Sequence, residues 1–262
     1  MSDKKYWVPA IERANNILNL IASRPAHYRL IEISHETGIN KSSLYSLLQT
    51  LEQLEWVVKE EDDTYSIGHT LGILASPYYS NLSVIKVFHK EAKASVERTG
   101  ETFQLGNLEG IYNVYLAREM NSSLVQMLTA PGSRLPAYAT ALGKAQLMDY
   151  SYEELAFLFR DIEFQKISNK TLDNVDDLWR DIQSGKSRGF MLDKGEVAED
   201  INCIAAPIYD FNQRIIAAVS ITMLTSKWEE KREAAEKEVL DLANRISSQF
   251  GYKKESFQEI EG

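Results

Sequence analysis

The chain of 262 residues contains a single cysteine, Cys203, and only 4 histidines. One cysteine cannot form an intrachain disulfide, which fits a protein of a reducing compartment. No apolar run approaches the roughly 18 residues of a membrane span, and the N-terminal segment lacks the apolar core of a signal peptide. We therefore expect a cytoplasmic protein with no membrane partner.

An excess of positive charge is also missing. The formal net charge is −9, and residues 1–59 carry 7 Lys+Arg against 6 Asp+Glu. A general binder of nucleic acid usually has a basic surface. Any DNA contact must therefore depend on shape and a few polar groups, with two copies of the chain acting together.

Motifs of catalysis and cofactor binding are absent. The sequence has no G-x-S-x-G elbow, no phosphate-binding glycine loop, no H-E-x-x-H and no paired C-x-x-C. All the histidines precede Cys203, and no His/Cys cluster has the spacing of metal ligands. We expect no catalytic residue, no metal and no cofactor.

The first seventy residues have the periodicity of short helices. Residues 9–23 and 29–38 place apolar side chains on one helical face, and Gly38 suits a helix end. The side chains expected to point inward are Ile11, Ala14, Ile17, Leu18, Ile21, Leu30 and Ile33.

The stretch "NKSSLYSLLQTLEQLEW", residues 40–56, combines a small, polar first turn with a regular leucine stripe. Asn40 is a favourable N-cap. The expected buried stripe is Leu44, Leu47, Leu48, Leu51 and Leu54. Extended runs at 56–59 and 64–67, joined by the acidic turn "EEDD", follow. Three helices, a glycine turn and a hairpin are the layout of a winged helix-turn-helix.

The outward face of this third helix is a candidate DNA-binding surface. Small hydroxyl side chains let a helix N-terminus approach phosphates and base edges closely. We predict that Ser42 and Ser43 hold phosphates and that Tyr45 and Gln49 touch bases or sugars. The other residues of the predicted face are Ser46 and the nearest cations, Lys41 and Arg29. The alternative is that this helix is only one wall of a three-helix core with solvated serines.

The remaining residues mix helices and strands. We predict helices at 69–81 (broken near Pro77), 83–100, 139–150 and 227–250, and strands at 102–108, 111–117, 124–129, 189–193, 201–210 and 214–223. The turn residues "DFNQ" between the last two strands predict a hairpin. Alternation in "RIIAAVSIT" places Ile216, Ala218, Ser220 and Thr222 on one face and Ile215, Ala217, Val219 and Ile221 on the other. This pattern predicts an apolar core on one side and a polar concavity on the other.

Three blocks closely resemble the IclR family of bacterial transcriptional regulators. They are "RLIEISHETGINKSSLYSLLQTLEQLEWV", "RLPAYATALGKAQL" and "GFMLDKGEVAEDINCIAAPIYDFNQRIIAAVSI", and the similarity covers essentially the whole chain. The resemblance implies an α+β protein with a winged helix-turn-helix at 1–68, a linking helix at 69–81, a GAF-like effector-binding domain at 82–252 and a tail at 253–262. It also implies operator DNA as a partner and a homodimer, often paired again as a homotetramer.

The resemblance further implies an effector site. Its polar positions are Asp193, Cys203, Ser220 and Thr222, and its apolar walls are Met127, Leu135 and Ile201. Ala141 and Leu142 begin a helix, and their backbone N–H groups are expected to point at the ligand. Such free donors at a helix N-terminus suit a carboxylate. We therefore predict a small organic-acid effector and, by default, a repressor.

Several alternatives remain open. Cys203 is also typical of a buried core residue, Ser220 and Thr222 of an edge strand facing water, and Asp193 of a turn cap before Gly195. The chain departs from the family pattern at three places. Many members have His-Arg where this chain has Tyr45 and Ser46, a further Arg at Ser66, and a His at Tyr138. These departures and the acidic balance leave a winged-helix protein-interaction module as the alternative function.

Overall fold

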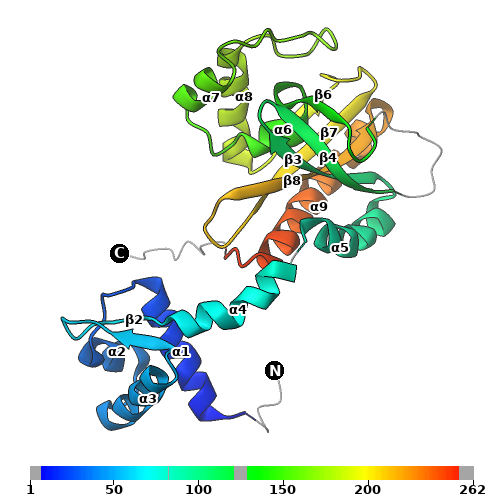
Figure 1. Cartoon of the computed structure of the whole chain (residues 1–262). Helices are drawn as coiled ribbons and strands as arrows, with labels where there is room; N and C mark the ends of the chain where they lie inside the picture. Colours follow the sequence, from blue (N-terminus) through cyan, green and yellow to red (C-terminus); the bar gives the residue numbers. More distant parts are fainter. Residues whose placement is uncertain (1–6, 82, 121–128, 254–262) are drawn as a thin grey trace, which may run out of the picture. The chain divides into compact units, whose positions relative to one another are not determined.

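The computed structural model describes residues 7–81, 83–120 and 129–253 (Figure 1). The chain divides into two compact units, Met1–Asn81 and Leu82–Gly262. This division falls at the boundary that separates the predicted linking helix from the predicted effector-binding domain. The finer division of each unit remains a prediction.

The N-terminal unit is a winged helix-turn-helix. Its elements are α1 (Pro9–Ser23), α2 (Leu30–Thr37), α3 (Lys41–Gln53), β1 (Val57–Lys59), β2 (Tyr65–Ile67) and α4 (His69–Asn81). Strands β1 and β2 pair antiparallel as the wing. Gly38 ends α2 with φ +67°, and Asn40 caps α3 by accepting the Ser43 N–H at 2.9 Å. Gly38 and Asn40 therefore form the turn that the sequence predicts between the second and third helices.

Most of the predicted inward residues form the core of this unit. Ile17, Ile21, Ile33, Leu44, Leu48 and Leu51 are buried, and Ala14, Leu18, Leu30 and Leu47 pack against them. Two predictions are wrong, because Ile11 is 69% exposed and Leu54 is 47% exposed. Ile11 lies in the first turn of α1 and Leu54 is the C-cap of α3. Helical spacing assigns a face but not how far the neighbouring elements extend along it.

The predicted break near Pro77 is also wrong. Helix α4 continues from His69 to Asn81. A proline within a helix removes one backbone hydrogen bond, and the remaining bonds can carry the helix through.

The C-terminal unit is built on one antiparallel sheet of six described strands, in the order β5-β4-β3-β8-β7-β6. The strands are β3 (Thr102–Glu109), β4 (Tyr112–Glu119), β5 (Arg134–Pro136), β6 (Met191–Lys194), β7 (Ile201–Tyr209) and β8 (Ile215–Leu224). The helical elements are α5 (Val84–Thr99), the 3-10 turn η2 (Ala137–Ala139), α6 (Ala141–Gln146), α7 (Tyr152–Leu158), α8 (Val175–Arg188), the 3-10 turn η3 (Thr225–Lys227) and α9 (Trp228–Gln249). The predicted β7–β8 hairpin is confirmed. The predicted strand at 124–129 falls almost entirely outside the described residues. The predicted helix at 139–150 is shorter, because Thr140 caps its start and Leu147 ends it.

The sheet separates two apolar cores. Helices α5 and α9 cover one face and pack on Val219, Ile221 and Ile204, whereas α6 packs on the other face with Ala205 and Ala218 (Figure 1). The parity predicted for β8 holds from Ala217 onward. It fails at Ile215 and Ile216, which exchange faces because the pairing with β7 shifts between Ile208 and Tyr209. The α6 face therefore carries Ser220 and Thr222, as predicted.

Candidate DNA-binding face and effector site

The outer face of α3 brings together most of the residues predicted to contact DNA. Lys41, Ser42, Tyr45, Ser46 and Gln49 are exposed, and Ser43 is half-buried. The Ser42 hydroxyl donates to Asn40 Oδ1 at 2.9 Å, and the Ser46 hydroxyl donates to the Ser42 carbonyl at 3.2 Å. Gln49 Nε2 donates to Glu52 Oε2 at 2.9 Å. The face is therefore polar and small at its front, and a DNA contact would replace internal hydrogen bonds that are weakly held at an exposed surface.

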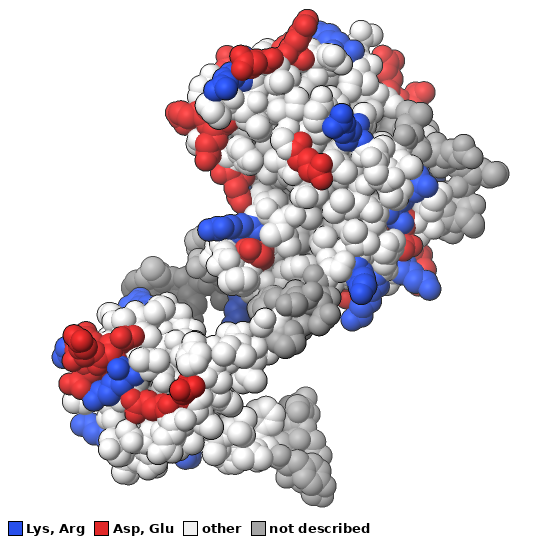
Figure 2. All heavy atoms as spheres, in the orientation of Figure 1, with Lys and Arg blue, Asp and Glu red and all other residues white. Residues whose placement is uncertain are grey.

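Arg29 lies apart from this face. It precedes α2 and forms an isolated bridge with Thr64, beside the wing. Hydrogen bonds from Thr64 lower the pKa of Asp62, and the Arg29 charge lowers it further. Lys59 forms an ion pair with Asp63 in the same wing. The acidic turn is thus partly neutralised by its own neighbours, and acidic and basic residues are interspersed on the face shown in Figure 2.

The α6 face of the sheet aligns the polar residues predicted for the effector site. Asp193 pairs with Cys203, which pairs with Thr222, and Ser220 pairs with Ala205 in the neighbouring row. Ser220 and Thr222 are buried on a central strand. The alternative that they are edge-strand hydroxyls facing water is therefore wrong. Cys203 Sγ lies 3.3 Å from Thr222 Oγ1, and burial raises the pKa of its thiol.

Two further polar residues on this face were missed by the sequence reasoning. Gln104 on β3 accepts from Thr222 Oγ1 at 3.4 Å and donates to Thr129 Oγ1 at 2.6 Å. Burial raises the pKa of Tyr115, and the charge of Asp193 adds to that rise. The available signal was the alternation of Thr102 and Gln104 with apolar residues in β3.

Asp193 serves as a turn cap as well as lying in this row. Its Oδ1 accepts the Glu196 N–H at 2.6 Å, and burial raises its pKa to about 6. The turn-cap interpretation thus describes a real contact.

The first backbone hydrogen bond of α6 runs from the Lys144 N–H to the Thr140 carbonyl. The backbone N–H groups of Ala141 and Leu142 precede this bond and have no acceptor within the helix. Leu135 and Cys203 pack against the core on this side, Ile201 is half-buried at the start of β7, and Met127 lies outside the described residues.

A buried ion cluster lies under this face. Lys144 is fully buried, and its Nζ lies 2.7 Å from Asp181 Oδ2 and 2.6 Å from Glu196 Oε1. Burial alone would lower the pKa of Lys144, but the charges of Glu196 and Asp181 outweigh it and raise the pKa. Burial also raises the pKa of Glu196 to about 7, and its second oxygen is buried with no hydrogen-bond partner in the described part of the chain. A lone lysine in the apolar run "ALGKAQL" was the signal for this cluster.

The raised pKa of Asp193 predicts a pH-dependent stability. Because its pKa is about 6 in the folded chain against an ordinary 3.8, the folded state binds more protons between these values, so wild-type stability falls as pH rises through them. An Asp193→Asn variant keeps the capping oxygen but does not titrate. We expect its stability relative to wild type to increase from pH 4 to pH 7, by on the order of 1–3 kcal/mol. Urea unfolding across this pH range measures the difference, and parallel profiles would contradict it.

Both domains match family models of known proteins. Residues 76–248 match the family model described as bacterial transcriptional regulator IclR C-terminal, and residues 10–61 match the IclR helix-turn-helix domain. The chain belongs to the IclR family. This IclR-family protein is a DNA-binding transcriptional regulator.

Individual relatives match most of the IclR-family chain. It is 28% identical over 247 residues to the HTH-type transcriptional regulator XynR of Escherichia coli K12, covering 94% of this chain and 98% of that protein. It is 28% identical to the transcriptional repressor AllR of the same organism, covering 93% and 91% of the two chains. The crystal structure of the Agobacterium tumefaciens repressor BlcR matches with 27% identity and a TM-score of 0.79, covering 96% of this chain and 100% of that one.

None of the helices described combines the length and apolar character that crossing a bilayer requires. The described part of the chain also holds no group of three or more His, Cys, Asp or Glu side chains placed to bind a metal ion.

Proposed function

We propose that this IclR-family regulator is a repressor whose hold on operator DNA is modulated by a small organic acid. The observation that carries the effector proposal is the polar row on the α6 face. Asp193, Cys203 and Thr222 are register partners on adjacent strands, with Ser220 in the next row. AllR and BlcR are both named repressors, which supports the same direction of control here.

The chemistry of this face suits a hydroxy or keto acid. The N–H groups of Ala141 and Leu142 are donors for a carboxylate. Asp193 is an acceptor for a ligand hydroxyl, and the hydroxyls of Ser220 and Thr222 can donate or accept. The proposed apolar walls are Met127, Leu135 and Ile201, and Cys203 completes the row. Mostly apolar walls with a few convergent polar groups are typical of small-molecule sites.

We also propose that two copies act together, as a dimer or a dimer of dimers, in the cytoplasm and without catalysis. Residues 1–59 hold nearly balanced charge, so a single winged helix would gain little from nonspecific attraction to phosphates. Two linked copies raise the effective concentration of the second contact without any new residue. Size-exclusion chromatography with light scattering tests the assembly.

Footprinting on the DNA upstream of the protein's own gene tests the proposed function. A repressor is expected to protect a near-palindromic site and to release it when the correct acid is added. The panel would contain pyruvate, glyoxylate, sugar-acid breakdown products and aromatic acids. Absence of protection at low salt would favour the protein-interaction module.

Substitutions in the polar row are expected to remove the effector response. A ligand present at a hundred times its dissociation constant adds about 2.7 kcal/mol of stability, so the responsive acid is found by thermal shift of the full chain. We expect Asp193→Asn and Ser220→Ala to weaken that shift and the release of DNA. Ser184→Ala, an exposed serine on α8, is the matched control. If both row variants released DNA like wild type, the effector would have to bind elsewhere.

A further inference from the structure

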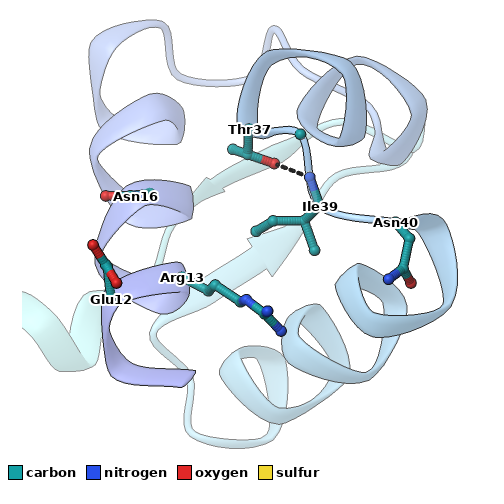
Figure 3. Close-up of a pocket in the computed structure, with 7 residues that line it drawn as sticks. Glu12, Arg13, Asn16, Thr37, Ile39 and Asn40 are labelled. Atoms are coloured by element: carbon teal, nitrogen blue, oxygen red, sulfur yellow. Dashed lines mark hydrogen bonds between the residues drawn. The ribbon is translucent and has the colours of Figure 1, made fainter. Parts of the chain in front are cut away.

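A pocket of about 290 Å³ lies within the N-terminal unit, between α1 and the turn that joins α2 to α3. Glu12, Arg13 and Asn16 line it from α1, and Thr37 to Asn40 line it from the turn (Figure 3). In Figure 3 the Arg13 side chain extends from α1 in the direction of α3. The pocket therefore adjoins the start of α3, whose outer face carries the residues predicted to contact DNA.

The pocket presents hydrogen-bond donors that have no partner among the described residues. The side chains of Arg13 and Asn16 make no hydrogen bond or ion pair to any residue that the structure describes. Asn40 uses its Oδ1 to accept from Ser42 and Ser43, which leaves its amide nitrogen as a donor. The one carboxylate in the lining, Glu12, accepts the indole N–H of Trp7 at 2.8 Å. An Arg guanidinium flanked by amide donors matches the oxygens of a phosphate.

The other cations of this unit are placed differently. Within residues 7–81 they are Arg24, Arg29, Lys41 and Lys59. Lys59 is paired with Asp63, and Arg29 lies near Asp62 and Asp63 at the wing. Arg24 follows the C-terminal end of α1. Only Arg13 and Lys41, among the described cations, lie beside the start of α3 without an acidic partner.

We propose that Arg13 binds a DNA phosphate at the edge of the groove entered by α3. The phosphates bordering a major groove flank a helix that inserts its N-terminal end, so a cation beside that end meets them. The unit, residues 1–81, carries 7 Lys+Arg against 10 Asp+Glu, so each such contact contributes a large share of the total attraction to DNA. The small polar front of α3 favours a duplex over a protein as the occupant. This inference rests on the proposed function, because it requires that α3 enters DNA.

Salt-dependent binding of a duplex tests this inference. A phosphate contact carries no sequence information, so a random duplex at low salt serves as probe beside any protected promoter fragment. Arg13→Gln is expected to weaken binding of both probes about tenfold and to reduce the slope of log K against log salt by about one for each bound winged helix. Arg24→Gln, the matched control at the far end of α1, is expected to bind like wild type. Arg13→Lys keeps the charge and is expected to preserve the slope.

A second measurement keeps the test decisive if a variant folds poorly. Phenylglyoxal modifies exposed arginines of the unaltered protein, and mass spectrometry locates the sites. Bound DNA is expected to protect Arg13 and to leave Arg24 reactive. Equal binding by Arg13→Gln and Arg24→Gln, or modification of Arg13 unaffected by DNA, would overturn the inference while the regulator stands. Failure of wild type to bind any duplex would remove both proposals.

Discussion

A Lys144→Met variant is expected to lose about 3–5 kcal/mol of stability, because it leaves the carboxylates of Asp181 and Glu196 without their buried cation. Lys144 and Glu196 are buried, so water cannot readily replace the lost charge at Glu196, whereas the Asp181 side chain is already half-exposed. Urea unfolding of the full chain at pH 7, followed by far-ultraviolet circular dichroism, measures the loss. The effector-binding domain should unfold first, since the cluster joins α6, α8 and the segment after β6.

Two controls separate charge from packing in this prediction. Lys194→Met removes an exposed lysine and is expected to change stability by less than about 0.5 kcal/mol. Adding Glu196→Gln to Lys144→Met removes the buried carboxyl group that has lost its cation and is expected to recover part of the loss. A Lys144→Met chain as stable as Lys194→Met would show that the cluster contributes nothing to the fold.

The largest expected effect on DNA binding comes from Ser43→Glu. This change places a carboxylate at the front of α3, where it would face phosphates, and like charges brought together at an interface cost several kcal/mol. We expect affinity for the protected promoter fragment to fall by about a hundredfold or more. Gel shift at fixed salt measures the loss.

The fold of the winged helix should survive this substitution. Ser43 is the third residue of α3, and an acidic side chain near a helix N-terminus is favourable to the helix. Ser43→Gln has nearly the same shape without the charge and should lose far less affinity. If Ser43→Glu bound DNA like wild type while remaining folded, the front of α3 would not lie against the duplex.

Local features of the sequence were enough to predict the winged helix and the last hairpin. Gly38 and Asn40 end one helix and begin the next through contacts within three residues, so their effect is visible without any tertiary partner. The β7–β8 turn is similar, because Asp210 accepts the N–H groups of Asn212 and Arg214. Strand alternation correctly assigned Ser220 and Thr222 to the polar face.

Other features depended on where distant elements meet. Periodicity does not encode which elements lie next to a residue or how strands pair. These neighbours and pairings set the exposure of Ile11 and Leu54 and the bulge that exchanges Ile215 and Ile216. They also set the path of α4 past Pro77.

By itself the sequence determined the layout of the N-terminal unit, the two faces of β8 and, through its resemblance, the family. Only the tertiary structure decided that Lys144 meets Glu196 across 52 residues, that Gln104 joins Thr222 across 118, and that Arg13 stands beside α3. The physical reason is that a pattern along the chain states which way a side chain points. Its partner is fixed by packing free energy summed over the whole unit.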